Sequence, residues 1–135
     1  MFVLDTNTVI YFFKGMGGVA ERLLSTPPGE IGLPTVVLFE LQTGIAKSTN
    51  GLRRRQQLDA LVRSAVVLPF GVDEARAAAG VRAAMERGGT PIGPIDNLIA
   101  GTAIVQNGAL VTRNVHEFNR VPGLSVENWF DEGMK

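Results

Sequence analysis

The chain has 135 residues, of which 45% are hydrophobic and 19% are charged. This length fits one domain over residues 1–135, and the composition is that of a globular protein, which excludes a disordered chain. The 13 Lys and Arg residues equal the 13 Asp and Glu residues in number. This balance excludes a uniformly basic nucleic-acid binder, so any RNA or DNA contact needs a local basic patch.

The chain contains no cysteine and one histidine, His116. Disulfides, thiolate metal sites, thiol nucleophiles and His-rich metal sites are therefore excluded, and the remaining oxygen ligands suit Mg²⁺, Mn²⁺ or Ca²⁺. No apolar run approaches the ~20 residues of a membrane span, and residues 1–5 lack the features of a signal peptide. We therefore expect a cytoplasmic protein without a membrane segment.

Short apolar strands alternate with helices in the first half of the chain. In chain order we expect a strand at 2–4, a short helix at 19–24, a strand at 31–33 and helices that begin at Pro34 and at Leu52. The residues from Thr8 to Lys14 fit either a helical turn or a continued strand, because most of them are β-prone. Pro27 and Pro28 end the short helix.

The second half of the chain repeats this alternation. We expect a strand at 66–68, an Ala-rich helix capped by Asp73, a helix at 95–106, a strand at 109–112 and a last strand near 124–126. The helix at 95–106 is apolar on nearly all sides and should lie at the centre. Strands that alternate with helices predict an α/β fold with a largely parallel sheet between helices.

Three acidic residues stand in apolar surroundings. Asp5 ends a buried strand, Glu40 interrupts an apolar helical turn, and Asp96 opens the central helix. A buried carboxylate without a partner is costly, so each needs a cation or a set of hydrogen bonds. Ligand sites in α/β sheets gather at the carboxyl ends of the strands. The three acids could therefore meet in one cleft, where a divalent ion would offset their mutual repulsion.

Each acid also has an ordinary structural interpretation. Asp5 could cap the following helix, and Asp96 falls near the third helical position, where an acid favours the helix dipole. Glu40 could face solvent between apolar neighbours. The combination of the three acids with their flanking residues favours a functional site.

Four motifs occur in order along almost the whole chain. They are Leu4-Asp5-Thr6-Asn7, Glu40-Leu41-x-x-Gly44, Gly93-Pro94-Ile95-Asp96-x-Leu98-Ile99-Ala100 and Leu110-Val111-Thr112-Arg113-Asn114-x-x-Glu117-Phe118. Together they resemble the PIN-domain ribonucleases, and among these the VapC toxins of bacterial toxin–antitoxin pairs. The resemblance implies a three-layer α/β/α PIN-like fold with a mostly parallel sheet, and an acidic pocket that holds Mg²⁺ or Mn²⁺.

The resemblance also implies roles for these acids. Asp5, Glu40 and Asp96 match the family's catalytic acids, with Asp5 and Asp96 as metal ligands and Glu40 holding a water or taking its proton. The family often has a fourth acid two residues after the Thr of the last motif. Asn114 occupies that position here, and Glu117 is another source of the charge.

The implied activity is hydrolysis of RNA phosphodiester bonds, with tRNA among the candidate substrates. The implied partners are a VapB-like antitoxin and a second copy of the chain in a homodimer. Because a pocket of acids repels RNA, cations outside it must hold the substrate, and Arg113 and Arg120 are the candidates. Thr6, Asn7 and Thr112 either orient the carboxylates or are ordinary turn residues.

Other interpretations of the motifs are weaker. Gly15-x-Gly17-x-x-Ala20 fits a dinucleotide-binding fingerprint if Val9–Phe13 is its strand, but Pro27 leaves the following helix too short. A dehalogenase-like phosphatase needs a second Asp where this chain has Asn7, and a receiver module needs a Lys at a late strand end. The main alternative is a non-catalytic or regulatory metal-binding module.

Overall fold

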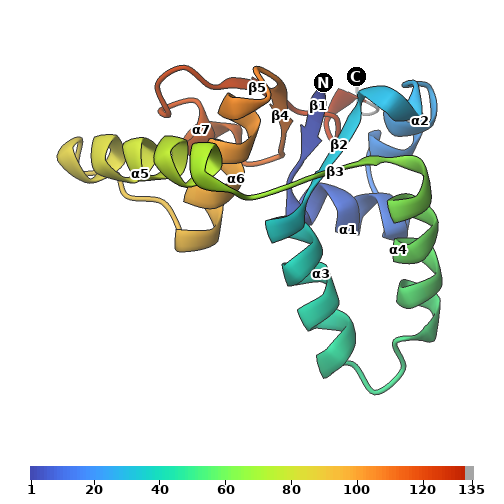
Figure 1. Cartoon of the computed structure of the whole chain (residues 1–135). Helices are drawn as coiled ribbons and strands as arrows, with labels where there is room; N and C mark the ends of the chain where they lie inside the picture. The colour runs from blue at the N-terminus through green and yellow to red at the C-terminus, as the bar shows by residue number, and fades with distance from the viewer. Residues whose placement is uncertain (133–135) are drawn as a thin grey trace.

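The computed structural model describes residues 1–132, so the last three residues of the predicted domain, 133–135, lie outside the described residues. Five strands form one sheet, in which every pairing is parallel (Figure 1). The strands are β1 (Phe2–Leu4), β2 (Ile31–Pro34), β3 (Val66–Leu68), β4 (Ala109–Val111) and β5 (Ser125–Glu127), in the spatial order β3-β2-β1-β4-β5. All five predicted strands are confirmed.

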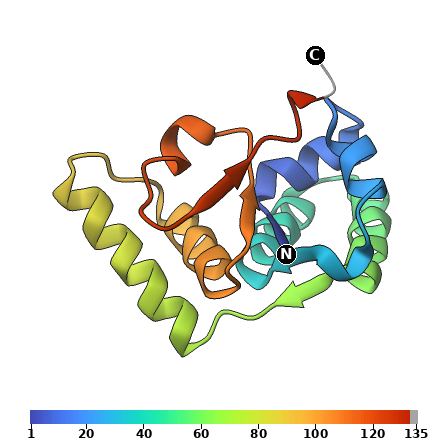
Figure 2. The same ribbon diagram turned by 90° about the horizontal axis from the view of Figure 1, so that it is seen from above.

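Helices cover both sides of the sheet (Figures 1 and 2). One side carries α1 (Thr6–Lys14), α2 (Val19–Leu24), α3 (Thr35–Lys47) and α4 (Leu52–Ser64). The other side carries α5 (Val72–Arg87), α6 (Pro94–Val105) and α7 (Val115–Phe118). A single 3₁₀ turn, η1 (Pro28–Glu30), precedes β2. This arrangement confirms the predicted three-layer α/β/α fold.

The order of the strands places a switch point beside β1. From β1 the chain builds outward to β2 and then β3, and it returns across the sheet to add β4 and β5 on the opposite flank of β1. The connections leave the sheet on opposite faces at this point, which opens a crevice at the carboxyl ends of β1 and β4. The candidate site residues Asp5 and Thr112 directly follow these two strands.

The core fills both faces of the sheet. Val3, Leu4 and Leu110 on the central strands are fully buried. Helix α6 lies very close to α5, because a Cβ at Gly101 would stand only 2.6 Å from the backbone nitrogen of Ala78. The absence of a side chain at Gly101 therefore sets how closely these two helices pack.

Some local predictions need correction. Val9–Phe13 belongs to α1 and not to a strand, so the dinucleotide-binding interpretation is wrong. Asp73 is not the cap of α5: the cap is Gly71, whose backbone N–H donates to Glu74 Oε1 at 2.7 Å. Helix α7 was not expected from the sequence. Within residues 1–132 no helix has the length and apolar character needed to cross a bilayer.

Candidate active site

Asp5 lies in the first turn after β1 and caps α1. Its Oδ1 accepts a hydrogen bond from the backbone N–H of Thr8 at 2.8 Å, so the capping interpretation is confirmed. The residue is only 7% exposed. Burial raises the pKa of the Asp5 carboxyl, hydrogen bonds from Thr112 and Thr8 oppose this rise, and the charge of Glu40 adds to it. Asp5 is thus a helix cap and a desolvated carboxylate at once.

Glu40 projects from α3 toward the same place. Its Oε1 accepts a hydrogen bond from the Thr6 hydroxyl at 2.5 Å, which ties α3 to the first turn of α1. The side chain is partly buried, and its charge raises the pKa of both Asp5 and Asp96. Glu40 therefore belongs to the acidic group and does not simply face solvent.

Asp96 is the third residue of α6, behind the cap residue Gly93. This is the position near the positive end of the helix dipole that the sequence indicates. Burial raises the pKa of the Asp96 carboxyl to about 6, with further contributions from the charges of Asp5, Glu117 and Glu40. The structure thus brings the three predicted acids within electrostatic reach of one another.

Glu117 adds a fourth carboxylate to this group. It lies on α7, and its charge contributes to the raised pKa of Asp96. The side-chain amide of Asn114 donates a hydrogen bond to Glu117 Oε2. The sequence left Asn114 and Glu117 open as the fourth residue of the acidic site. In the structure Glu117 supplies a negative charge near Asp96, and Asn114 hydrogen-bonds Glu117.

A cavity of about 270 Å³ opens at the carboxyl ends of β1 and β4. It is lined by Asp5, Asn7, Tyr11, Arg113 and Asn114. A larger cavity of about 480 Å³ lies between α5 and α6, and its lining is mostly apolar. The smaller cavity is the one that coincides with the switch point of the sheet and is lined by Asp5, so we take it as the candidate site.

The acidic group has no internal counter-charge among the described residues. The ion pairs found in residues 1–132 do not involve Asp5, Glu40, Asp96 or Glu117. Within the same range, no three Asp, Glu or His side chains are close enough together to form a ready-made set of metal ligands. The acids repel one another, and their oxygen donors suit a hard divalent cation, which would remove that repulsion. The oxygen donors present therefore fit a hard divalent cation.

Neighbouring polar residues orient the acids. Thr6 donates to Glu40, and the hydroxyl of Thr112, which hydrogen-bonds Asp5, accepts the backbone N–H of Asn114 at 3.0 Å. Asn7 lines the cavity. The hydroxyls of Thr6 and Thr112 each hydrogen-bond an acid of the site, which goes beyond the role of an ordinary turn residue.

The predicted phosphate-binding arginines differ in their surroundings. Arg113 lines the cavity and lies over the ring of Phe130, with its Cζ 3.7 Å from the ring centroid. Arg120 instead contacts His116 Nε2 at 2.8 Å on the exposed surface. Phe130 was not identified from the sequence, although a second aromatic residue beside Trp129, between polar neighbours, is a signal that could have identified it.

A comparison with family models matches the PIN domain over residues 2–124. A "tRNA(fMet)-specific endonuclease VapC" of Salmonella typhimurium is 32% identical over 128 residues, covering 95% of this chain and 97% of the relative. The protein of the same name from Shigella flexneri is 34% identical, with the same coverage. "Ribonuclease VapC2" of Rickettsia felis is 34% identical over 131 residues, covering 96% of this chain and 98% of the relative.

Solved structures give the same result. VapBC2 of Rickettsia felis, bound to a DNA fragment from its promoter, matches with a TM-score of 0.87 and 33% identity, covering 95% of this chain and 98% of the other. DNA-bound VapBC of Salmonella typhimurium matches with a TM-score of 0.87 and 33% identity, covering 95% and 97%. The family model, the relatives and the fold agree: the chain belongs to the VapC ribonucleases of the PIN-domain family.

Proposed function

We propose that the chain is a Mg²⁺- or Mn²⁺-dependent endoribonuclease whose catalytic acids are Asp5, Glu40 and Asp96, with Asp5 and Asp96 as the metal ligands. The main support is the convergence of these acids at the switch point of the sheet, with no paired Lys or Arg in the described part of the chain. Glu117 adds to the negative charge that attracts the cation. With Glu117 in place of the family's fourth acid, the site has four carboxylates, and we take this as favouring an enzyme over a non-catalytic metal-binding module.

The side chains divide the work of phosphodiester hydrolysis. Glu40 Oε1 is engaged by Thr6, which leaves Oε2 free to accept a proton from the attacking water. Thr112 and the backbone of Thr8 hold Asp5 in a fixed orientation for the cation. When bound, a divalent cation lowers the pKa of water and stabilises negative charge on the phosphoryl oxygens.

Initiator tRNA is the substrate to test first. Two of the relatives above carry names that specify tRNA(fMet), and each match extends over 97% of the relative's length. We extend this substrate class to the present chain. An RNA substrate is consistent with an action in the cytoplasm.

The test is cleavage of an initiator tRNA transcript by the wild type and by Asp5→Asn, with Mn²⁺ and with a chelator. We expect the wild type to cleave with Mn²⁺ and not in chelator, and Asp5→Asn to cleave in neither. Arg76→Gln, an exposed change on α5, should behave as the wild type. Cleavage by Asp5→Asn at the wild-type rate would contradict the assignment. A wild type that binds Mn²⁺ but cleaves no transcript and no total RNA would support the non-catalytic module instead.

We also propose a VapB-like antitoxin as the protein partner. The similar structures from Rickettsia felis and Salmonella typhimurium are VapBC complexes. In this chain a cavity of about 250 Å³ between α1, α3 and α4 includes Glu40 in its lining, so a segment of another protein seated there would reach the acidic group. Co-expression with the neighbouring upstream reading frame should give a stable complex with no ribonuclease activity.

A homodimer is the assembly we propose for the chain itself. Phe39 on α3 is 62% exposed and Val72 on α5 is 71% exposed, and a dimer interface over either helix would cover such apolar surface. Light scattering of the purified chain should give twice the 14.5 kDa monomer mass. A monomer mass would contradict this proposal and leave the nuclease assignment untouched.

A further inference from the structure

We infer that Phe130 is a positioning residue: its ring holds the Arg113 guanidinium at the mouth of the acidic cavity, where it contacts an RNA phosphate and does not pair with the carboxylates. This inference rests on the proposed function of the acidic site. It assigns a role in substrate binding to the segment that follows the last strand.

Arg113 is held by two aromatic rings, one on α1 and one in the turn that follows β5. Its Cζ lies 3.7 Å from the centroid of Phe130 and 5.9 Å from that of Tyr11, and these two rings meet edge to face at 4.7 Å. Contact with the face of a ring uses the flat side of a guanidinium and leaves the N–H donors on its edge free. Those donors have the fork geometry that binds phosphate bidentately.

This contact decides which partner Arg113 takes. Arg113 and Asp5 line the same cavity, yet Arg113 forms no ion pair with an acid in residues 1–132. An arginine that entered the acidic group would neutralise it and compete with a divalent cation. The Phe130 ring offers the guanidinium an alternative position at the edge of the cavity, so the acids keep their charge.

Phe130 packs against the turn between α1 and α2, and this turn has no room for a side chain at position 17. It is 8% exposed, and its carbonyl accepts the backbone N–H of Gly18 at 2.9 Å. Gly17 has φ +63°, and a Cβ there would lie 2.7 Å from Phe130 Cγ. Glycine at position 17 therefore allows the ring to lie against the turn between α1 and α2.

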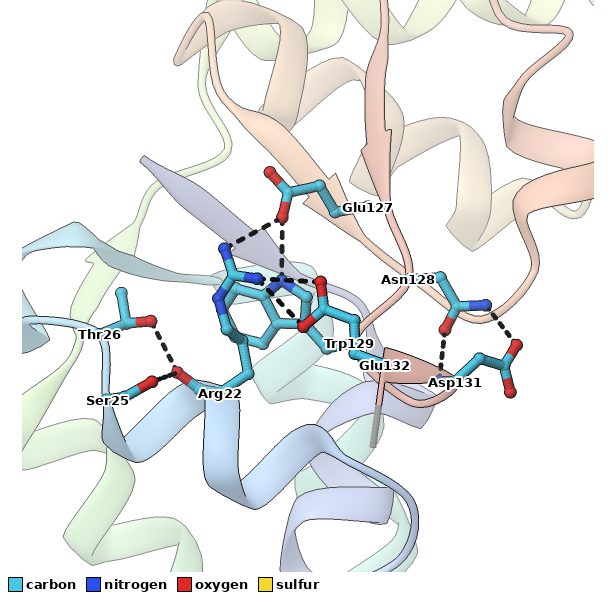
Figure 3. A network of polar contacts seen from close by, with 8 residues as sticks. All are labelled: Arg22, Ser25, Thr26, Glu127, Asn128, Trp129, Asp131 and Glu132. Atoms are coloured by element: carbon cyan, nitrogen blue, oxygen red, sulfur yellow. Dashed lines mark hydrogen bonds and ion pairs between the residues drawn. The ribbon is translucent and has the colours of Figure 1, made fainter. Parts of the chain in front are cut away.

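The chain on both sides of Phe130 is anchored to α2 (Figure 3). Arg22 Nη1 donates to both carboxylate oxygens of Glu132 at 2.9 and 3.0 Å, and Nη2 contacts Glu127 Oε1 at 3.5 Å. The Arg22 guanidinium also lies over Trp129, whose indole N–H donates to Glu127 Oε1 at 3.0 Å. These contacts hold the segment 127–132 on the body of the protein, and the ring of Phe130 with it.

The experiment measures binding of a fluorescein-labelled initiator tRNA transcript in Mg²⁺, with every protein carrying Asp5→Asn to prevent cleavage. Arg113→Gln should raise Kd about tenfold, the loss of one charged hydrogen-bonded contact. Phe130→Leu should raise it about threefold, since the arginine remains but is no longer held. Phe130→Tyr keeps a ring face and should bind as the parent does.

The double variant separates positioning from a general structural role. If Phe130 acts through Arg113, Phe130→Leu adds nothing in the Arg113→Gln background. The slope of log K against log salt should fall by about one unit for Arg113→Gln. Arg76→Gln is the matched arginine control and should leave both Kd and slope unchanged. If Phe130→Leu melts below the assay temperature, Phe130→Met, which keeps apolar bulk without a ring, replaces it.

Three results would overturn the inference. One is an equal effect of Phe130→Leu with and without Arg113, another is an unchanged Kd for Arg113→Gln, and the third is a loss of binding by Phe130→Tyr as large as that of Phe130→Leu. Each of these is compatible with cleavage that depends on Asp5. The inference and the nuclease assignment therefore fail separately.

Discussion

The ionisation of Asp96 is the residue-scale feature that follows most directly from the structure. Its carboxyl is partly buried and faces three other acids, and these surroundings raise its pKa to about 6. An unfolded chain would titrate this group near 3.8. In the folded protein without metal, the ionised carboxylate of Asp96 is therefore destabilising, and protonation of this carboxylate would remove the penalty.

We expect stability without metal to fall as the pH rises from about 4 to about 6. In this window the unfolded chain has lost the Asp96 proton and the folded chain still binds it, so ΔG of unfolding decreases with pH. Asp96→Asn removes this penalty and should be more stable than the wild type at pH 7, by about 1–2 kcal/mol once solvent screening of the partly exposed group is allowed for. The two proteins should be equal near pH 3.5. Urea unfolding in chelator at both pH values measures this, and a less stable Asp96→Asn at pH 7 would show that the acid is chiefly structural.

Asp5 combines capping with charge, and two substitutions separate the functions. Asp5→Asn removes the charge and keeps an oxygen that can accept the Thr8 N–H, whereas Asp5→Ala loses both. We expect Asp5→Asn to be more stable than Asp5→Ala by about 1 kcal/mol. At Asp59, an exposed position inside α4, the order should reverse because Ala is the better helix former. Thermal melts in chelator give both comparisons, and equal stability of the two Asp5 variants would mean that the cap contributes nothing.

At the scale of elements, the packing of α6 against α5 positions Asp96. Gly101 meets Ala78 across this contact, while Gly80 on α5 faces open space. The two glycines therefore separate a packing requirement from a helix-propensity effect.

Gly101→Ala should destabilise the protein by about 1–3 kcal/mol, because the new methyl group must push α5 away. Gly80→Ala should stabilise it by about 0.5–1 kcal/mol, since the helix gains propensity and meets no neighbour. Denaturant midpoints of the two variants check the signs. A stabilising Gly101→Ala would mean that α5 and α6 are less tightly packed than the structure has them.

The helices and strands also show how much of the fold and of the candidate site could be predicted from the sequence. Apolar runs located all five strands, and three acids in apolar surroundings indicated the candidate site. The residues of α1 were ambiguous because they are β-prone, although Val9 and Phe13 are buried at helical spacing. The placement of Glu117 could not be predicted, because it depends on α7, a four-residue helix with no periodic pattern. Phe130 was missed because its partners, Tyr11 and Arg113, are distant in sequence.

At the scale of the whole molecule, the topology explains why acids so far apart in the sequence meet. Asp5 follows β1, Glu40 lies on the helix after β2, Asp96 begins the helix before β4, and Glu117 lies on the helix after β4. The switch point of the sheet brings these segments to the carboxyl ends of its central strands. We propose that the repulsion that results drives the binding of a cation, so that the stability of the fold and the proposed activity depend on the same residues.

Calorimetric titration of the wild-type chain with Mn²⁺ at pH 7 tests this account most directly. We expect saturable binding by the wild type and by Asp59→Asn, an exposed acid on α4, and loss of that binding in Asp5→Asn and Asp96→Asn. Binding that persists in both site variants, or a wild type that binds no Mn²⁺, would contradict the claim that these acids form the metal site.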